Sequence, residues 1–208
     1  MQTRTIAITA AGVVALGIGA AFLATTVLAP AQRLEACTQG RVAGGAIGGP
    51  FTLIDEEGQT VTDADVIDGP TLIYFGYTFC PDVCPLDTVR SAEALDILVE
   101  EGRDVDFLFI SVDPGRDTPE VLKEFTGDFH PNMIGLTGTE EQIAEAARNY
   151  RVVYEVHDDE DDEFYLVDHM TFTYYVTPDD GFVDFFRRDM GPEQMAETVG
   201  CFIDAGYV

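Results

Sequence analysis

Basic residues are scarce in this chain. Its 208 residues include 11 Lys and Arg against 38 Asp and Glu, which gives a formal net charge of −27 at pH 7. A surface so poor in cations cannot neutralise phosphates, so the composition excludes nucleic-acid binding and disfavours a protein that lies flat on anionic lipid. Two interpretations of the acidic excess stay open: an adaptation for solubility or salt, and electrostatic steering toward a cation or a positively charged partner.

Charge of either sign is missing between Arg4 and Arg33. The apolar run from Ile6 to Ala29, at about 1.5 Å per residue, exceeds the ~30 Å hydrocarbon core of a bilayer, so residues 1–30 are predicted to form a single transmembrane anchor. A cleaved secretory signal is the alternative, because Ala29-Pro30-Ala31 resembles a cleavage site, but the run is longer than a usual signal core. Either interpretation exports the rest of the chain.

The orientation of the anchor follows from the flanking arginines. Arg4 favours a cytoplasmic N-terminus, although Arg33 and Arg41 compete from the other side. We expect a single-pass protein of the inner (cytoplasmic) membrane, with its soluble domain on the periplasmic or an equivalent oxidising side. Residues 31–50 are rich in Gly, Ala and Pro and are predicted to be a flexible tether, which leaves residues 51–208 for one domain.

Strand and helix patterns alternate along the first part of this domain. A short hairpin is predicted at residues 51–62, and strands are predicted at 71–77, 105–112 and 133–136 from their apolar, β-rich composition. Helices are predicted at 85–101, from Thr118 with Pro119 in the first helical position, and from Thr139 to about Tyr150 with a capping-box start.

The final third changes to strands at 152–156, 172–176 and 182–186, with a turn at Pro178-Asp179-Asp180-Gly181 and a last helix after Gly191-Pro192. Parallel strands joined by helices, followed by an antiparallel hairpin and a helix, are the plan of a thioredoxin fold. We therefore predict an α/β, thioredoxin-like fold with an added N-terminal β-hairpin, preceded by a single transmembrane helix.

Cysteine is also sparse, with four residues in the chain. Cys80 and Cys84 lie between a predicted buried strand and the start of a helix, where the helix N-terminus favours the thiolate. Three residues separate them, one more than in the usual dithiol-exchange motif. This spacing allows both sulfurs to surround one ion, and it still allows a disulfide. Two thiolates and one imidazole suit a soft ion such as Cu(I), with Cu(II) tolerated.

The chain offers three histidines as the third ligand: His130, His157 and His169. His130 precedes a proline in a loop, and His157 abuts the acidic run from Asp158 to Glu163. A packing or surface role is the favoured interpretation of both. His169 directly precedes the strand pair that a thioredoxin fold places beside its active-site loop. Spacing alone does not assign it as a ligand.

The segment from Tyr74 to Pro85, YFGYTFCPDVCP, closely resembles the signature of the Sco/SenC family of copper-binding assembly factors for cytochrome c oxidase. Three further stretches occur in family order: SVDPGRDTP from Ser111, Val167-Asp168-His169, and YVTPDDG from Tyr175. The resemblance covers residues 51–199 and implies copper ligands at Cys80, Cys84 and His169. It also implies delivery of copper to, or thiol reduction of, the binuclear copper centre (CuA) of oxidase subunit II, with other copper chaperones as further partners.

Several residues lie outside this family pattern or beside its site. Phe79 stands where many relatives have His. Cys37 and Cys201 could pair, but four cysteines allow three connectivities and the sequence does not choose among them. Asp113, Arg116 and Asp117 fit turns and a helix start, with support of the metal site as the alternative, and Asp168 could orient the adjacent imidazole. The acidic run from Asp158 is expected to be a solvated loop.

Three function classes share these residues. The first is a metal-transfer protein that is not primarily an enzyme. The second is a thiol–disulfide oxidoreductase in which Cys80 and Cys84 reduce the target cysteines before metallation. The third, a thiol peroxidase, needs one thiolate in a water-excluding pocket with an activating Arg, and no residue pair marks such a pocket.

Overall fold

The computed structural model describes residues 37–38, 47–157 and 164–208. The chain divides into two units, residues 1–41 and 42–208, and the fold described below belongs to the second. Within the described part of the chain, no helix has both the length and the apolar character needed to cross a membrane. The predicted anchor at residues 1–30, most of the predicted tether and the acidic run from Asp158 to Glu163 lie outside the described residues. The anchor and the tether therefore stay predictions. Cys37 and Cys201 are each disulfide-bonded.

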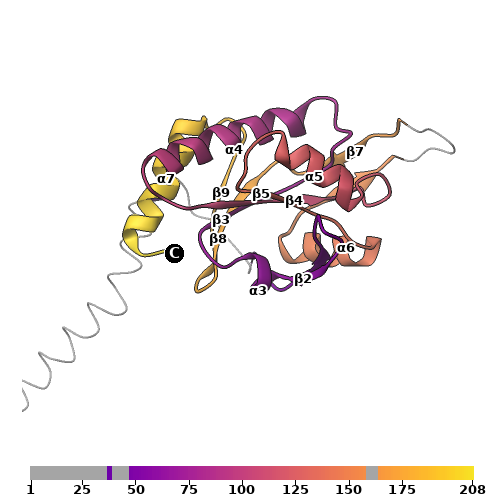
Figure 1. Cartoon of the computed structure of the whole chain (residues 1–208), viewed down its shortest axis with the longest axis horizontal. Helices are drawn as coiled ribbons and strands as arrows, with labels where there is room; N and C mark the ends of the chain where they lie inside the picture. The colour runs from indigo at the N-terminus through magenta and orange to yellow at the C-terminus, as the bar shows by residue number, and fades with distance from the viewer. Residues whose placement is uncertain (1–36, 39–46, 158–163) are drawn as a thin grey trace, which may run out of the picture. The chain divides into compact units, whose positions relative to one another are not determined.

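A five-stranded sheet forms the centre of the second unit (Figure 1). Its strand order is β5-β4-β3-β8-β9, made by β3 (Thr71–Gly76), β4 (Asp106–Ser111), β5 (Met133–Leu136), β8 (Thr173–Thr177) and β9 (Gly181–Phe186). Strands β3, β4 and β5 are parallel, whereas β8 is antiparallel to both of its neighbours, β3 and β9. Parallel strands continued by an antiparallel hairpin confirm the predicted mixed α/β, thioredoxin-like fold.

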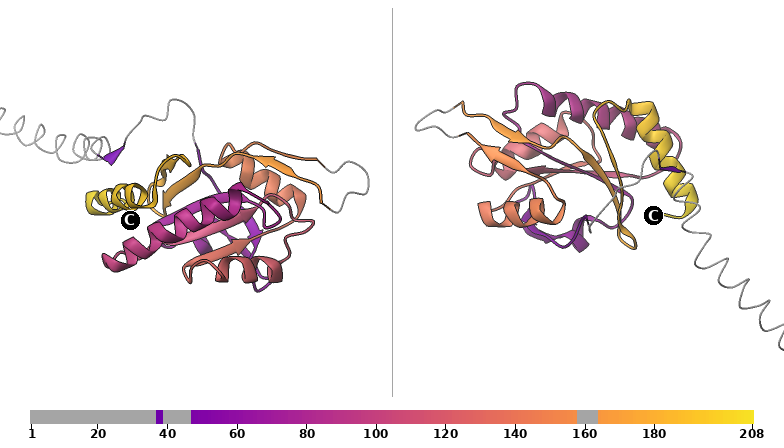
Figure 2. Two further views of the ribbon diagram at one scale, coloured as in Figure 1. Left: turned by 90° about the horizontal axis from the view of Figure 1, so that it is seen from above. Right: turned by 180° about the vertical axis from the view of Figure 1, so that it is seen from behind.

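Helices cover both faces of this sheet (Figures 1 and 2). One face carries α4 (Val83–Glu100), α5 (Pro119–Gly127) and α7 (Pro192–Ala205). The other carries α6 (Glu140–Asn149), α3 (Asp63–Val66) and the predicted hairpin of β1 (Thr52–Ile54) and β2 (Thr60–Thr62). The crossovers from β3 to β4 and from β4 to β5 run in the same direction across the sheet. Because such crossovers are almost always right-handed, both place their helices, α4 and α5, on the same face.

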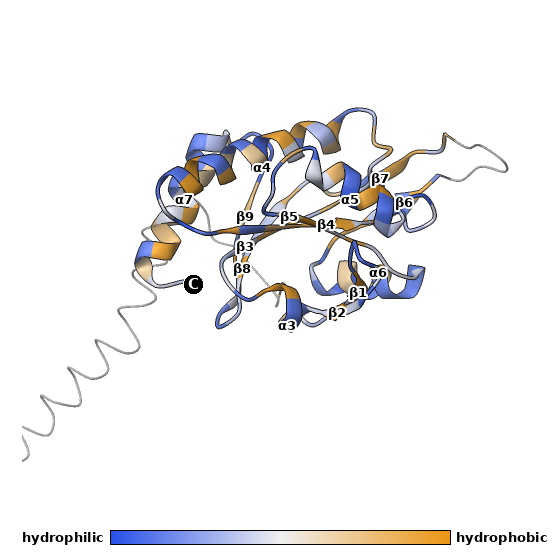
Figure 3. Ribbon diagram, in the orientation of Figure 1, coloured by the Kyte–Doolittle hydropathy of each residue, from blue (hydrophilic) through white to orange (hydrophobic). Residues whose placement is uncertain are grey.

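The apolar runs predicted at residues 71–77 and 105–112 form the central parallel strands β3 and β4. Every residue of β3 is buried, and in β4 only Asp106 is not fully buried. Both faces of these strands are covered, so their sequences are continuously apolar and do not alternate, as the hydropathy colouring shows (Figure 3). The predicted bounds of these strands differ from the observed ones by at most one residue at each end.

Helix α4 starts earlier than the sequence predicts, and its buried face is partly polar. It begins at Val83 and not at Pro85, so Cys84 lies within its first turn. Leu86 and Val89, two of the apolar residues of this helix, are 58% and 42% exposed. The buried stripe instead includes Cys84, Thr88, Ser91, Leu95 and Leu98, which recur at helical spacing.

The segment before the last strand pair also differs from expectation. Strand β6 (Tyr154–Val156) does not join the central sheet but pairs antiparallel with β7 (Val167–His169), which the sequence did not predict as a strand. Tyr154 faces His169 in this register. The two strands form a separate hairpin outside the main sheet (Figure 2). His169 is the last residue of β7, and we call residues 164–169 the arm.

Candidate metal centre

Cys80 and Cys84 are held by the connection from β3 to α4. Cys80 lies in the loop, and Cys84 lies in the first turn of the helix; both are buried and both are free thiols. The backbone N–H of Cys84 donates to the sulfur of Cys80 at 3.3 Å. An N–H at a helix N-terminus has no intrahelical acceptor, so the Cys80 sulfur satisfies a group that would otherwise be unpaired. The resulting position favours the thiolate form of Cys80.

His169 reaches the same place from β7. Its Nε2 lies 3.1 Å from the sulfur of Cys84, and its Nδ1 lies 3.0 Å from the backbone carbonyl oxygen of Met170. A carbonyl oxygen only accepts hydrogen bonds, so the hydrogen of the neutral ring is on Nδ1. The lone pair of Nε2 therefore faces the two sulfurs. A carbonyl partner of this kind commonly fixes the tautomer and the orientation of a metal-binding imidazole.

The structure brings together the three residues that the sequence proposed as ligands. The two sulfurs and one ring nitrogen all lie within 4.8 Å of one another. With bonds of about 2.0–2.3 Å, as for sulfur and nitrogen on zinc, ligands of one ion lie at most about 4.6 Å apart, so a small inward movement suffices. Over the described ranges, no other set of three or more His, Cys, Asp or Glu side chains meets this criterion.

Two tyrosines enclose the imidazole. Tyr74 and Tyr77 both contact the ring of His169 edge-on, with ring centroids 6.0 and 5.8 Å away. The Tyr77 hydroxyl also accepts a hydrogen bond at 3.3 Å from the backbone N–H of Val167, two residues before His169. Tyr77, the last residue of the first predicted buried strand, therefore also holds the arm that carries the imidazole.

The pKa values of the two thiols are shifted in opposite directions. The Cys84 thiol donates a hydrogen bond to Cys80, which lowers the pKa of Cys80. The same contact raises the pKa of Cys84, and burial raises it further. One proton is thus held on Cys84 while Cys80 is anionic. A thiolate is both a metal ligand and a nucleophile, so Cys80 is available for either chemistry.

We call residues 77–82, which connect β3 to α4 and carry Cys80, the cysteine loop. Asp117 joins this loop to the end of β4. Its carboxylate accepts from the Thr78 N–H at 3.1 Å, from the Thr78 hydroxyl at 2.6 Å and from the Ser111 hydroxyl at 2.6 Å. Burial raises the pKa of Asp117, against the lowering effect of these donors. Asp117 therefore supports the loop from behind, as the alternative interpretation of the SVDPGRDTP stretch proposed.

The other two histidines lie away from the sulfurs. His130 is buried, and its Nδ1 accepts from the backbone N–H of Asn132 at 3.0 Å. The Nε2 of His157 lies 2.8 Å from a carboxylate oxygen of Asp168. The expectation that Asp168 orients His169 is therefore wrong. Alternating side chains of a strand point to opposite faces, which directs Asp168 to His157 and leaves the orientation of His169 to Met170.

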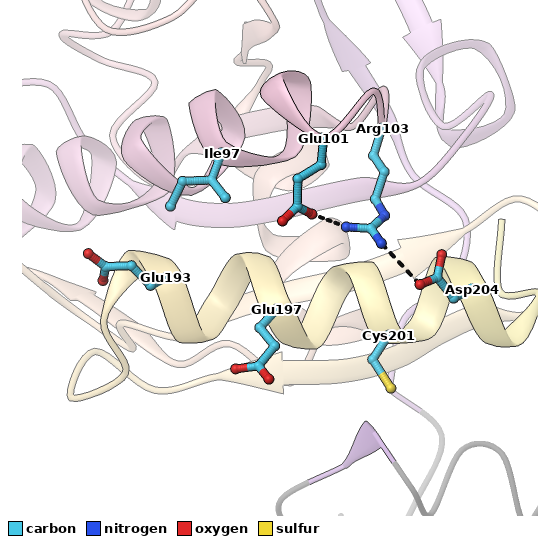
Figure 4. A pocket seen from close by; sticks show the side chains of 7 residues that line it. All are labelled: Ile97, Glu101, Arg103, Glu193, Glu197, Cys201 and Asp204. Carbon is cyan, nitrogen blue, oxygen red and sulfur yellow. Dashed lines mark hydrogen bonds and ion pairs between the residues drawn. The ribbon is translucent and has the colours of Figure 1, made fainter.

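A separate hollow of about 580 Å³ lies between α4 and α7 (Figure 4). Four of its lining residues are acidic, but Arg103 reaches between two of them, pairing with Glu101 and with Asp204 at 3.0 Å. These carboxylates are spread along the helices and partly neutralised, so the hollow is not a second convergent metal site.

Four contributors to the site were missed from the sequence. Tyr74 and Tyr77 lie in the family-like segment, but the sequence predicts them only as strand residues. The Met170 carbonyl belongs to the backbone, so no residue type indicates its role. Tyr165, whose hydroxyl donates to Asp113 at 2.6 Å, is a further contact of the arm. The only sequence signal for it was its position four residues before His169.

Comparisons with known proteins agree with this geometry. The family model described as SCO1/SenC matches residues 40–204. Protein SenC of Rhodobacter capsulatus is 54% identical over 205 residues, which are 98% of this chain and 91% of that protein. The crystal structure of Arabidopsis thaliana ScoI with copper bound is 42% identical with a TM-score of 0.71, covering 76% of this chain and 99% of that one. Bradyrhizobium japonicum ScoI with copper bound is 40% identical with a TM-score of 0.67, covering 74% and 98%. The chain belongs to the SCO1/SenC family.

Proposed function

We propose that this protein is a copper chaperone that carries its cargo on Cys80, Cys84 and His169 and delivers it to the binuclear copper centre of cytochrome c oxidase subunit II. The observation that carries the proposal is the convergence of two sulfurs and the Nε2 lone pair within 4.8 Å. Relatives of known structure hold copper, and a soft donor set of two sulfurs and one nitrogen favours Cu(I). The oxidase as recipient follows from the family resemblance.

Three ligands leave the cargo open to a fourth. A thiolate of the recipient binds the copper first, and one Cu–S bond to this protein then breaks. Each bond lost to Cys80 or Cys84 is replaced by one from the recipient, so the copper keeps its oxidation state and no electron is transferred. The free-energy barrier stays low because the ion is never left with fewer ligands than it starts with.

The proposal includes the organisation of the whole chain. Residues 1–30 form the membrane anchor, 31–50 the tether and 51–208 the copper-binding domain on the periplasmic or an equivalent oxidising side. The apolar run from Ile6 to Ala29 supports the anchor. A tether places the donor site near the membrane in which an oxidase would be assembled, and other copper chaperones could load it there.

Copper loading of the full chain in detergent, under reducing conditions, tests the proposal. We expect one copper per chain, with two sulfur ligands and one nitrogen ligand by X-ray absorption. Cys80→Ser or Cys84→Ser abolishes tight Cu(I) binding, and His169→Ala weakens it. Full copper affinity in the double cysteine variant would contradict the assignment.

A second candidate function, thiol–disulfide oxidoreductase, is favoured by the opposite acidities of the two thiols. The Cys80 thiolate attacks a target disulfide and forms a mixed disulfide. This first step releases one target thiolate. Cys84, after losing its proton, then attacks the Cys80 sulfur, which releases the second target thiolate and leaves a Cys80–Cys84 disulfide. Two electrons pass from this protein to its target.

The two functions differ in their need for the imidazole. A reductase needs Cys80 and Cys84 but not His169, whereas the copper carrier needs all three. Reduction of a model disulfide by His169→Ala at the wild-type rate, together with weakened copper binding, would show that both activities share one dithiol. Loss of the reductase activity in His169→Ala would argue against an independent reductase role.

A further inference from the structure

Arg116 contacts the arm that carries His169. Its guanidinium carbon lies 3.5 Å from the centroid of the Tyr165 ring, which is stacking distance. Its Nε donates to one oxygen of Asp113 at 2.5 Å, and the Tyr165 hydroxyl donates to the other oxygen at 2.6 Å. The Asp113 carboxylate thus binds the arginine and the tyrosine at once, and the arginine lies on the tyrosine ring. We call these three residues the latch.

The latch also reaches the cysteine loop. The same guanidinium carbon lies 4.9 Å from the ring centroid of Phe79 and 5.7 Å from that of Tyr77. Phe79 directly precedes Cys80, so one cation joins the β4–α5 loop, the cysteine loop and the arm of β7. The Asp113 and Arg116 side chains are only 3% and 14% exposed. Charge-assisted hydrogen bonds at such low exposure are stronger and less screened than surface ion pairs.

The arm needs ties of this kind because β7 does not belong to the central sheet. Its pairing with β6 is three residues long, and a two-stranded hairpin is marginally stable on its own. The described ties from the arm to the domain near His169 include the Val167–Tyr77 hydrogen bond and the latch. Tyr165 lies four residues before His169, so displacement of Tyr165 moves the imidazole relative to the sulfurs.

We propose that the Asp113–Arg116–Tyr165 latch holds the His169 arm over Cys80 and Cys84, so that Arg116 is a positioning residue for the third copper ligand. This inference rests on the proposed copper-carrying function. When the latch is closed, the imidazole completes the three-ligand site. When it is open, the copper retains only the two sulfurs.

The test combines copper affinity with a readout that needs no copper. Cu(I) affinity is measured by competition with a chromogenic chelator, and amide hydrogen exchange of Val167 and His169 is measured in the metal-free full chain. Arg116→Gln should weaken Cu(I) binding by about 10–100-fold, the usual effect of losing support behind a metal ligand, and should speed exchange at both amides. Tyr165→Phe keeps the ring under the guanidinium but loses the bond to Asp113, so its effects should be smaller in the same direction.

A matched control and a double variant separate positioning from general destabilisation. Arg187→Gln makes the same charge change at an arginine that is 71% exposed, and it should leave affinity and exchange unchanged. If the latch acts through the imidazole, Arg116→Gln should have no further effect on affinity in the His169→Ala background. An equal loss in both backgrounds would overturn the proposal, as would unchanged exchange in Arg116→Gln.

Two outcomes distinguish the latch from the function on which it rests. If the wild-type chain binds no copper, the copper-carrying function fails, and the exchange data still decide whether the latch holds the arm. If His169→Ala weakens binding while Arg116→Gln does not, the function stands and the latch is wrong. If Arg116→Gln does not fold, Arg116→Lys and Tyr165→Phe decide the question, because both keep the charges of the cluster.

Discussion

Gly76 lies directly behind the sulfur of Cys84 at the end of β3. A Cβ added there would meet Tyr74 Cε1 at 2.7 Å, the Cys84 sulfur at 3.1 Å and Phe109 Cζ at 3.1 Å. All three neighbours are buried, so none can move away freely. We expect Gly76→Ala to destabilise the domain by about 1–3 kcal/mol through overpacking and to weaken copper binding by displacing Cys84.

Urea unfolding of the metal-free protein measures this effect. Gly127→Ala is the matched control, because a Cβ at that position of α5 meets nothing within 4 Å, and alanine is the better helix former. The control should be neutral or stabilising. Equal stability of the two variants would contradict the close approach at Gly76.

The pKa of Cys80 predicts an unusual pH profile for its reactivity. The hydrogen bond from the Cys84 thiol lowers the pKa of Cys80, so its thiolate persists below the ordinary cysteine pKa of about 8.5. Alkylation of Cys80 in the metal-free protein should remain fast near pH 6–7, where an ordinary thiol is mostly protonated. In Cys84→Ala the donor is lost, and the midpoint of the rate profile should move to higher pH. A wild-type midpoint near that of free cysteine would show that Cys84 does not donate to Cys80.

At the scale of elements, the cysteine loop depends on its connection to β4 through Asp117. The carboxylate satisfies three donors from two segments. Asp117→Asn replaces one acceptor oxygen by a donor NH₂ group, so at least one buried donor loses its partner. We expect a loss of about 1–3 kcal/mol in stability and faster hydrogen exchange at Thr78.

Thermal unfolding and amide exchange check this prediction together. Glu124→Gln removes an equal charge from an exposed position of α5 and should change neither measurement. Reduced stability of Asp117→Asn with unchanged exchange at Thr78 would mean that Asp117 stabilises the protein without holding the cysteine loop.

The elements that could be predicted from the sequence are those whose signal is local. Strands β3 and β4 appear as continuous apolar runs because both of their faces are covered, and the Thr139 capping box marks the start of α6. The positions of Cys80 and Cys84 follow from the strand and helix on either side of them. The buried face of α4 does not follow apolar character alone, because Leu86 and Val89 are exposed while Thr88 and Ser91 are buried.

The position of His169 could not be derived from local pattern. Strand β7 is three residues long, only Val167 of it is fully buried, and its partner β6 precedes it by a segment of acidic residues. Such a pairing leaves no periodic signal in the sequence. The convergence of the imidazole with the sulfurs arises from tertiary contacts with Tyr74, Tyr77 and Tyr165, and only the family resemblance indicated it in advance.

For the whole molecule, the dominant property is its excess of negative charge, 38 acidic against 11 basic residues. Repulsion between carboxylates acts at the start of β4, where Asp106 lies near Asp104 and Asp68. Burial and then these two carboxylates raise the pKa of Asp106. A raised pKa in the folded state means that Asp106 contributes stability below the ordinary Asp pKa of about 3.9, and that this contribution is lost as the pH rises through the folded-state value. At pH 7, ionised Asp106 therefore opposes folding.

Salt should accordingly stabilise the folded domain. Raising NaCl from about 0.01 M to about 1 M shortens the Debye length from about 30 Å to about 3 Å, which screens repulsion between exposed carboxylates. If this screening raises the free energy of unfolding by about 1 kcal/mol, the Tm of a chain of this size rises by about 2–4 °C. Asp106→Asn should raise the Tm at low salt and pH 7 and raise it less at high salt, because salt already screens Asp104 and Asp68. A Tm that stays constant or falls with NaCl would show that the paired residues, not the unpaired carboxylates, dominate the electrostatics of this domain.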